Sequence, residues 1–172
     1  MMLIRDKIRT CIAIIFCLSS YSASAQWQTR SEPLFTGGDD VTIAYVTNDD
    51  GYSLEIYQDG AMVRGRFKLI EGLTVFYEDL CPTYQIDDGM ATNTSFDGTP
   101  CVYDRLWADY NFGEIENNSI ISPILRSLLD GNSMTFRFRL KDGDYRWTSF
   151  TLLGSTRSIT EIVGNQVSIR AR

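Results

Sequence analysis

Apolar and polar residues alternate in short runs between positions 41 and 110, and turn sequences separate these runs. Alternation with a period of two places the apolar side chains of a run on one face, which is the pattern of a half-buried β-strand. Asn48-Asp49-Asp50-Gly51 and Gln58-Asp59-Gly60 are typical of tight hairpin turns. This region therefore predicts successive antiparallel strands, over residues 41–46, 52–57, 61–69 and 73–78.

Two short helices are predicted in the second half of the chain. Ser122 is placed to cap the apolar run 124–129, Pro123 suits the first helical turn, and Gly131 suits the end of the helix. Residues 155–163 carry apolar side chains at helical spacing.

The remaining periodic segments are strands. Residues 101–110 predict one strand, and residues 134–141 and 145–153 predict a hairpin around the turn Asp142-Gly143-Asp144. The fold class that follows is mainly β: a single-domain antiparallel β-sandwich, or a partly open barrel, with two short helices.

The N-terminus has the pattern of a secretory signal peptide. Basic residues between positions 5 and 9 precede the apolar run 12–18, and Ala23-Ser24-Ala25 matches a cleavage site. We expect residues 1–25 to be removed and residues 26–172 to form one domain without a membrane span, located in the bacterial periplasm or secreted.

Two cysteines then remain in the mature chain. In an oxidising compartment Cys81 and Cys101 are expected to form a disulfide that closes the loop 81–101, which is rich in turn-forming residues and has little periodicity. The loop is either a functional segment or one that needs the disulfide for order. A lipid anchor at Cys11 or Cys17 is an alternative that the bulky Phe16 disfavours.

Composition excludes several classes of function. The chain contains no histidine, so Ser-His-Asp, Cys-His and histidine-based zinc sites are excluded. It also contains no nucleotide-binding loop and no nucleophile-elbow motif. A formal net charge of −6 argues against nucleic acid as a partner. We therefore expect a protein that is not an enzyme and that uses no cofactor or metal.

Acidic residues leave two alternatives open. A glycosidase-type carboxylate pair would draw on Glu78, Asp79, Asp104, Asp109, Glu114 and Glu116. A calcium site would best fit Asp87-Asp88-Gly89, although the same residues suit a simple turn.

The C-terminal third resembles two groups of exported bacterial proteins. The features that carry the resemblance are an apolar helix ending at Gly131, the strand 134–140, and the segment 150–155 that leads into a helix. The groups are the invasion-associated locus B family and the accessory proteins of type VI secretion loci related to VasI and TagO. The resemblance implies a small periplasmic β-sandwich-like protein without a known active site.

Two predicted strands carry a basic residue at every second position, and we call these rows the basic ladders. The first ladder consists of Arg64, Arg66 and Lys68, and the second of Arg137, Arg139 and Lys141. A period of two places each ladder on one face of its strand. Either the ladders are solvated outer faces, paired with neighbours such as Glu55 or Glu78, or they share one sheet face as a basic patch that docks an acidic partner, lipid A phosphates or an anionic glycan.

These observations favour a binding function. The leading hypothesis is an exported, non-enzymatic binding or accessory protein of the periplasm or cell envelope that docks a protein or anionic envelope component through a sheet face. The alternative is an inhibitor or immunity protein of an envelope hydrolase that acts through the loop 81–101. The large aromatic side chains Trp107 and Trp147 are expected in the core.

Overall fold

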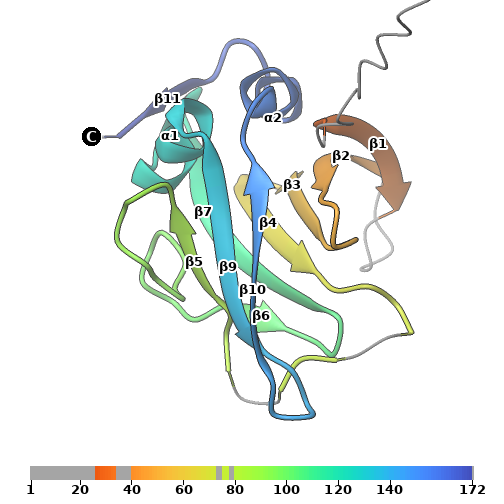
Figure 1. Ribbon diagram of the computed structural model, residues 1–172. Coiled ribbons are helices and arrows are strands. Elements are labelled where there is room, and N and C mark those ends of the chain that lie inside the picture. The colour runs from red at the N-terminus through yellow and green to blue at the C-terminus, as the bar shows by residue number, and fades with distance from the viewer. Residues whose placement is uncertain (1–25, 34–39, 73–74, 78–79, 172) are drawn as a thin grey trace, which may run out of the picture.

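The computed structural model describes residues 26–33, 40–72, 75–77 and 80–171 (Figure 1). The predicted signal peptide lies outside these residues. The strands are β1 (Gln28–Pro33), β2 (Asp40–Thr47), β3 (Ser53–Asp59), β4 (Met62–Lys68), β5 (Thr83–Ile86), β6 (Val102–Tyr103), β7 (Trp107–Glu116), β8 (Ser119–Ile121), β9 (Ser133–Arg139), β10 (Tyr145–Thr151) and β11 (Ser168–Arg170), and the helices are α1 (Pro123–Asp130) and α2 (Ser155–Val163). Within the described residues, no helix has the length and apolarity needed to span a membrane.

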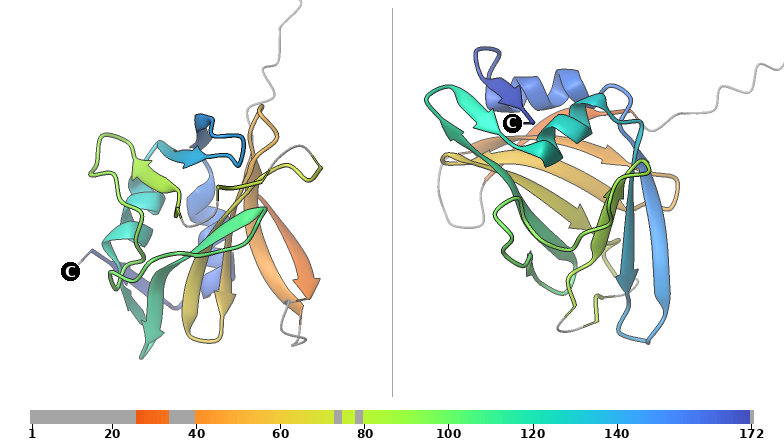
Figure 2. Two further views of the ribbon diagram at one scale, coloured as in Figure 1. Left: turned by 90° about the horizontal axis from the view of Figure 1, so that it is seen from below. Right: turned by 90° about the vertical axis from the view of Figure 1, so that its left-hand side faces the viewer.

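The strands form two sheets. The large sheet has the order β1-β2-β3-β4-β7-β8-β11, with β6 also paired to β7, and the small sheet has the order β10-β9-β5. The small sheet packs against one face of the large sheet, and both helices cover the same face at one end of the molecule (Figures 1 and 2). The described strands do not close into a barrel, so of the two predicted architectures the β-sandwich is the one that forms.

Aromatic rings fill the space between the sheets. Phe67 of β4 stacks on Phe136 of β9 with the ring centroids 4.5 Å apart, and its edges contact Phe138 and Phe150. Gly65 of β4 faces the same core, where an added Cβ atom would lie 1.9 Å from the ring of Phe112. The glycine in the first ladder is therefore a packing requirement, because any side chain there would displace that ring.

The helix α1 begins and ends where the sequence predicts. The side chain of Ser122 accepts a hydrogen bond from the backbone N–H of Leu125 and donates one to the carbonyl of Phe112, and Pro123 follows at the first helical position. At the C-terminal end, Gly131 has a φ of −80°, so it does not need glycine's access to positive φ. It is small because an added Cβ would lie 2.6 Å from the carbonyl oxygen of Ser127 in the last turn of α1 and 2.9 Å from Ile86 of β5.

The disulfide between Cys81 and Cys101 is present, but the loop that it closes is more regular than predicted. Thr83–Ile86 form β5, which pairs with β9 in the small sheet. Tyr84 is buried in the core at 2% exposure and bridges back to Thr92. The prediction of an irregular loop was wrong because β5 has only four residues and gains its order from tertiary pairing.

Two predicted strand boundaries also differ. In the predicted strand 73–78, residues 73–74 and 78 lie outside the described residues, and Phe76 makes an isolated bridge with Leu140. The predicted strand 101–110 is divided between the short β6 and the start of β7.

Candidate binding surfaces

The first basic ladder lies on the outer face of the large sheet. Val63 and Phe67 of β4 are fully buried in the core, so Arg64, Arg66 and Lys68 point to the opposite side, as the alternation predicts. The three cations differ in exposure. Arg66 is only 9% exposed, whereas the other two are half-buried.

Arg66 is buried because carboxylates flank it on both neighbouring strands. The register places Glu55 of β3 on one side and Asp109 of β7 on the other. Arg66 Nη2 lies 3.0 Å from Asp109 Oδ2, and Arg66 Nη1 lies 3.9 Å from Glu55 Oε2. Glu55 and Asp109 are 2% and 3% exposed, so the row is an ion-pair network shielded from water. The predicted cross-strand pairing with Glu55 is confirmed, and Glu78 lies outside the described residues.

Further side chains complete this network. The hydroxyl of Tyr57 donates to Asp109 and accepts from Arg66, and Arg30 of β1 donates to Glu55 across a distance of 2.6 Å. Burial raises the pKa of Tyr57, and the negative charge of Asp109 raises it further, so the hydroxyl remains a donor at neutral pH.

Arg64 and Lys68, the other cations of the first ladder, also face carboxylates. Arg64 Nε lies 3.1 Å from Asp109 Oδ1, although neither atom has a hydrogen bond of normal geometry. Lys68 Nζ lies 3.7 Å from Oε1 of the exposed Glu71. Because carboxylates neutralise these cations, the first ladder presents little net positive charge to an anionic ligand.

The second basic ladder lies on the outer face of the small sheet. Phe136 and Phe138 of β9 point into the core, so Arg137 and Arg139 point outward, and Lys141 follows at the exposed end of the strand. Since Phe67 and Phe136 meet between the sheets, the two ladders point in opposite directions. They do not share a sheet face, so the hypothesis of one combined basic patch does not fit this fold.

Aromatic side chains surround the second ladder. The guanidinium carbon of Arg139 lies 4.3 Å from the ring centre of Tyr77 and 5.2 Å from that of Tyr145. The register pairs Trp147 of β10 with Arg137, and these side chains share the outer face. We call this surface the hairpin face and define it as Tyr77, Arg137, Arg139, Tyr145 and Trp147.

Exposure of two large aromatic rings distinguishes the hairpin face. Trp147 is 75% exposed and Tyr145 is 71% exposed, so the prediction that Trp147 lies in the core was wrong. The alternation of β10 contained the signal: Phe150 and Trp147 have opposite parity, so the two rings must point to opposite faces. The other tryptophan expected in the core, Trp107, is half-buried against Arg66, with 5.0 Å between ring and guanidinium.

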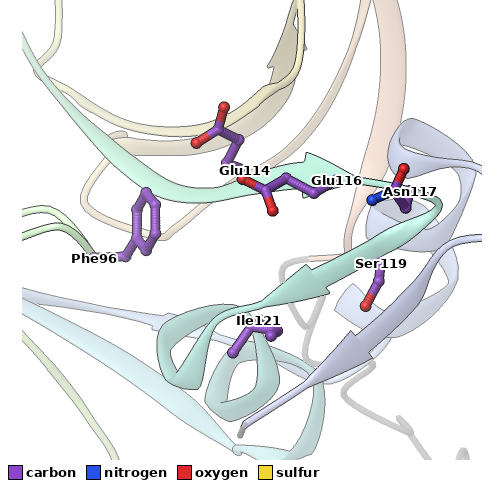
Figure 3. Close-up of a pocket in the computed structure, with 6 residues that line it drawn as sticks. All are labelled: Phe96, Glu114, Glu116, Asn117, Ser119 and Ile121. Carbon is purple, nitrogen blue, oxygen red and sulfur yellow. The ribbon is translucent and has the colours of Figure 1, made fainter.

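A separate pocket of about 330 Å³ lies beside β7 and β8. Figure 3 shows that Glu114 and Glu116 reach it from β7, while Ser119 and Ile121 reach it from β8. Phe96 lines its opposite side (Figure 3). Two predicted carboxylate candidates thus share a pocket. By contrast, the candidate Asp109 is held in the ion-pair network.

The acidic turn that we considered for calcium has a structural role. The carboxylate of Asp87 accepts hydrogen bonds from the backbone N–H groups of Asn132 and Ser133, at distances between 2.9 and 3.1 Å. These bonds hold the pKa of Asp87 below its usual value. The side chain ties the loop to the start of β9, although Asp87 and Asn132 are 45 positions apart in the sequence.

Comparison with known proteins identifies a similar fold. The structure matches that of invasion associated protein B from Bartonella henselae with a TM-score of 0.53, over 83% of this chain and 94% of that chain, at 13% sequence identity. Identity at this level shows the fold alone. The predicted resemblance to the invasion-associated locus B family is therefore confirmed for the fold, and the resemblance to VasI and TagO stays a prediction.

Sequence comparisons give no match. No protein-family model matches the chain, and a search of curated proteins finds no significant relative.

Proposed function

We propose that the mature protein is an exported, non-enzymatic adaptor of the bacterial cell envelope that docks an acidic protein through its hairpin face. The signal-peptide pattern and the disulfide support export. The fold shared with invasion associated protein B supports an envelope-associated accessory role.

The observation that carries the proposal is the composition of the hairpin face. Trp147 and Tyr145 are largely exposed beside Arg137, and tryptophan, tyrosine and arginine are the residues that dominate binding energy at protein interfaces. Tyr77 and Tyr145 hold Arg139 in place before binding, which reduces the entropy lost on association. On a chain with a net charge of −6, this exposed basic surface favours an acidic partner.

Site-specific crosslinking in the native envelope tests the proposal. A photoreactive amino acid at Trp147 should capture a partner with an acidic surface, and the same group at Lys68, on the opposite face, should not. Arg137→Glu should abolish that capture, because it places a repelling charge at the centre of the face. Equal capture from both positions, or capture that survives Arg137→Glu, would overturn the proposal.

Inhibition through the disulfide-closed loop is the second candidate, and one observation favours it. Met90 at the tip of the turn is 91% exposed, as an inserting apolar side chain would be. Against it, β5 is an integral strand of the small sheet, so this part of the loop is held in the fold. If the loop inhibits an envelope hydrolase, Met90→Asp should abolish that inhibition. If the protein instead docks its partner through the hairpin face, Met90→Asp should leave partner capture unchanged.

A further inference from the structure

Strand β10 is an edge strand of the small sheet, and its backbone groups can be assigned to the two sides of the strand. The N–H of Leu152 bonds to the carbonyl of Asn132, and the N–H of Leu140 bonds to the carbonyl of Asp144. The even-numbered residues of β10 therefore bond to β9. Because the pattern alternates, the backbone N–H and C=O groups of Tyr145, Trp147, Ser149 and Thr151 point away from the sheet.

Other parts of the molecule occupy half of this edge. Asn48 Nδ2 donates to the carbonyl of Ser149 at 3.0 Å, and Trp27 Nε1 donates to the carbonyl of Thr151 at 2.9 Å. In the part of the chain that the structure describes, no hydrogen bond from outside the hairpin reaches the backbone of Tyr145 or Trp147. Figure 2 shows the hairpin as a long arm at the side of the molecule, with this half toward its free end.

We propose that residues 145–147 of β10 form a docking edge, to which an extended segment of the acidic partner adds as a further antiparallel strand of the small sheet, whose described strands are all antiparallel. The inference rests on the proposed function and specifies its binding mode. Strand addition uses the backbone groups of Trp147 for affinity and the neighbouring side chains for specificity. The occupied carbonyls of Ser149 and Thr151 limit the added strand to the outer half of the hairpin.

Side chains along the edge define the chemistry of the segment. Tyr145 and Trp147 point to the outer face, and Arg146 points to the other face, 49% exposed, with an exposed pair to Asp144 at 3.2 Å. A residue opposite Arg146 is therefore best acidic, and its two neighbours, beside the aromatic rings, are best apolar. The expected segment alternates apolar and acidic residues.

A second copy of this chain fits the same edge poorly. An antiparallel pair of two β10 edges centred on position 146 would place Arg146 directly opposite its own copy. Like charges in directly opposite positions destabilise a strand pair. Charge complementarity thus favours an acidic segment of another protein over self-association.

Peptide titration followed by NMR tests the docking edge. The probe is a capped peptide of alternating valine and glutamate, and the reference is the same peptide with lysine in place of glutamate. We expect the glutamate peptide to shift the amide signals of Tyr145 and Trp147, to slow their hydrogen exchange, and to bind at least about tenfold more tightly than the lysine peptide. Equal binding of the two peptides, or signal changes confined to other surfaces, would overturn the assignment.

Two matched modifications isolate the backbone contribution. Trp147→Ala and Trp147→Pro both remove the ring, but only proline removes the N–H that faces the edge. The Trp147→Pro variant should therefore bind the valine–glutamate peptide about tenfold more weakly than the Trp147→Ala variant. In the peptide, N-methylation of the valines should abolish binding by the wild-type protein, whereas N-methylation of the glutamates should not, because only the valine amides face β10.

The results separate this inference from the proposed function. If the peptide with N-methylated valines binds as well as the peptide with N-methylated glutamates, strand addition is wrong, even if Arg137→Glu still abolishes partner capture. If Arg137→Glu leaves partner capture intact, the proposed docking through the hairpin face is wrong. The N-methyl comparison uses wild-type protein, so a folding defect of Trp147→Pro does not affect it.

Discussion

At the scale of single residues, charge burial separates two groups of arginines that look alike in the sequence. Arg66 and Arg137 both alternate with apolar residues on a strand, yet the first is 9% exposed between two carboxylates and the second is exposed on the hairpin face. Neighbouring strands make the difference. β3 and β7 supply Glu55 and Asp109 beside Arg66, whereas β10 supplies the ring of Trp147 beside Arg137.

Removing Arg66 should destabilise the fold. Arg66→Met removes the cation that lies between the buried Glu55 and Asp109 and leaves each carboxylate with one further cation, Arg30 or Arg64, and we expect the free energy of unfolding to fall by about 3 kcal/mol. Lys68→Met is the matched control, since Lys68 lies on the same face of β4 and pairs with an exposed glutamate, and it should change the free energy by less than about 1 kcal/mol. Urea denaturation measures both, and equal effects would contradict a buried network.

Asp87 should stabilise the protein only where it is ionised. Its pKa is lowered in the folded state, so its contribution is present above the unfolded pKa of about 3.9 and is lost as the pH falls through the folded value. Asp87→Asn should lower the melting temperature at pH 7, and the difference from wild type should shrink as the pH falls below about 3.9. Asp88→Asn is the control next in sequence. A difference in melting temperature that is constant with pH would show that the charge of Asp87 does not contribute to stability.

At the scale of elements, short strands depend on partners that are distant in the sequence. β5 has four residues, and its pairing with β9 bridges about fifty residues of chain. The disulfide and the Asp87 hydrogen bonds restrain the same segment from both ends. The hairpin of β9 and β10, by contrast, follows from a local turn, and the sequence alone predicts it.

The disulfide should therefore contribute substantially to stability. It closes a loop with a sequence separation of 20, for which the loss of unfolded-chain entropy corresponds to about 3 kcal/mol. We expect chemical denaturation to show that the double variant Cys81→Ala, Cys101→Ala has lost about that much of its free energy of unfolding. In this variant, hydrogen exchange should be faster in β5 than in β4. Wild-type protein under reducing conditions should behave in the same way; unchanged stability there would refute the role.

At the scale of the whole molecule, the sandwich separates two chemically different outer faces. The face of the large sheet carries paired charges, and that of the small sheet carries exposed aromatic rings with arginines. The core, in which Phe67 and Phe136 stack, lies between the two outer faces and keeps their side chains apart. Because this core separates the two faces, a substitution on one should leave the other unchanged.

Fluorescence quenching should report this separation without knowledge of the partner. Of the three tryptophans, Trp27 is 5% exposed, Trp107 is half-buried and Trp147 is 75% exposed. Trp147→Phe should remove most of the quenchable emission. Arg137→Glu should weaken quenching of Trp147 by iodide and strengthen quenching by caesium, because Arg137 attracts the anion. Quenching by both ions that is unchanged in Arg137→Glu would contradict a basic hairpin face.

Short-range interactions make several elements of this fold predictable before the structure is known. Turn residues, capping at Ser122 and the alternation of β4, β9 and β10 predict the hairpins, the helix and the faces of both ladders, because these depend on neighbours within a few residues. The pairing of Cys81 with Cys101 follows from the count of cysteines outside the predicted signal peptide. Tertiary structure alone decided which sheet each ladder joins, since strand order is not encoded in alternation. It thereby buried Arg66 beside Asp109, 43 positions along the chain, whereas the pairing of Trp147 with Arg137 already follows from the local hairpin.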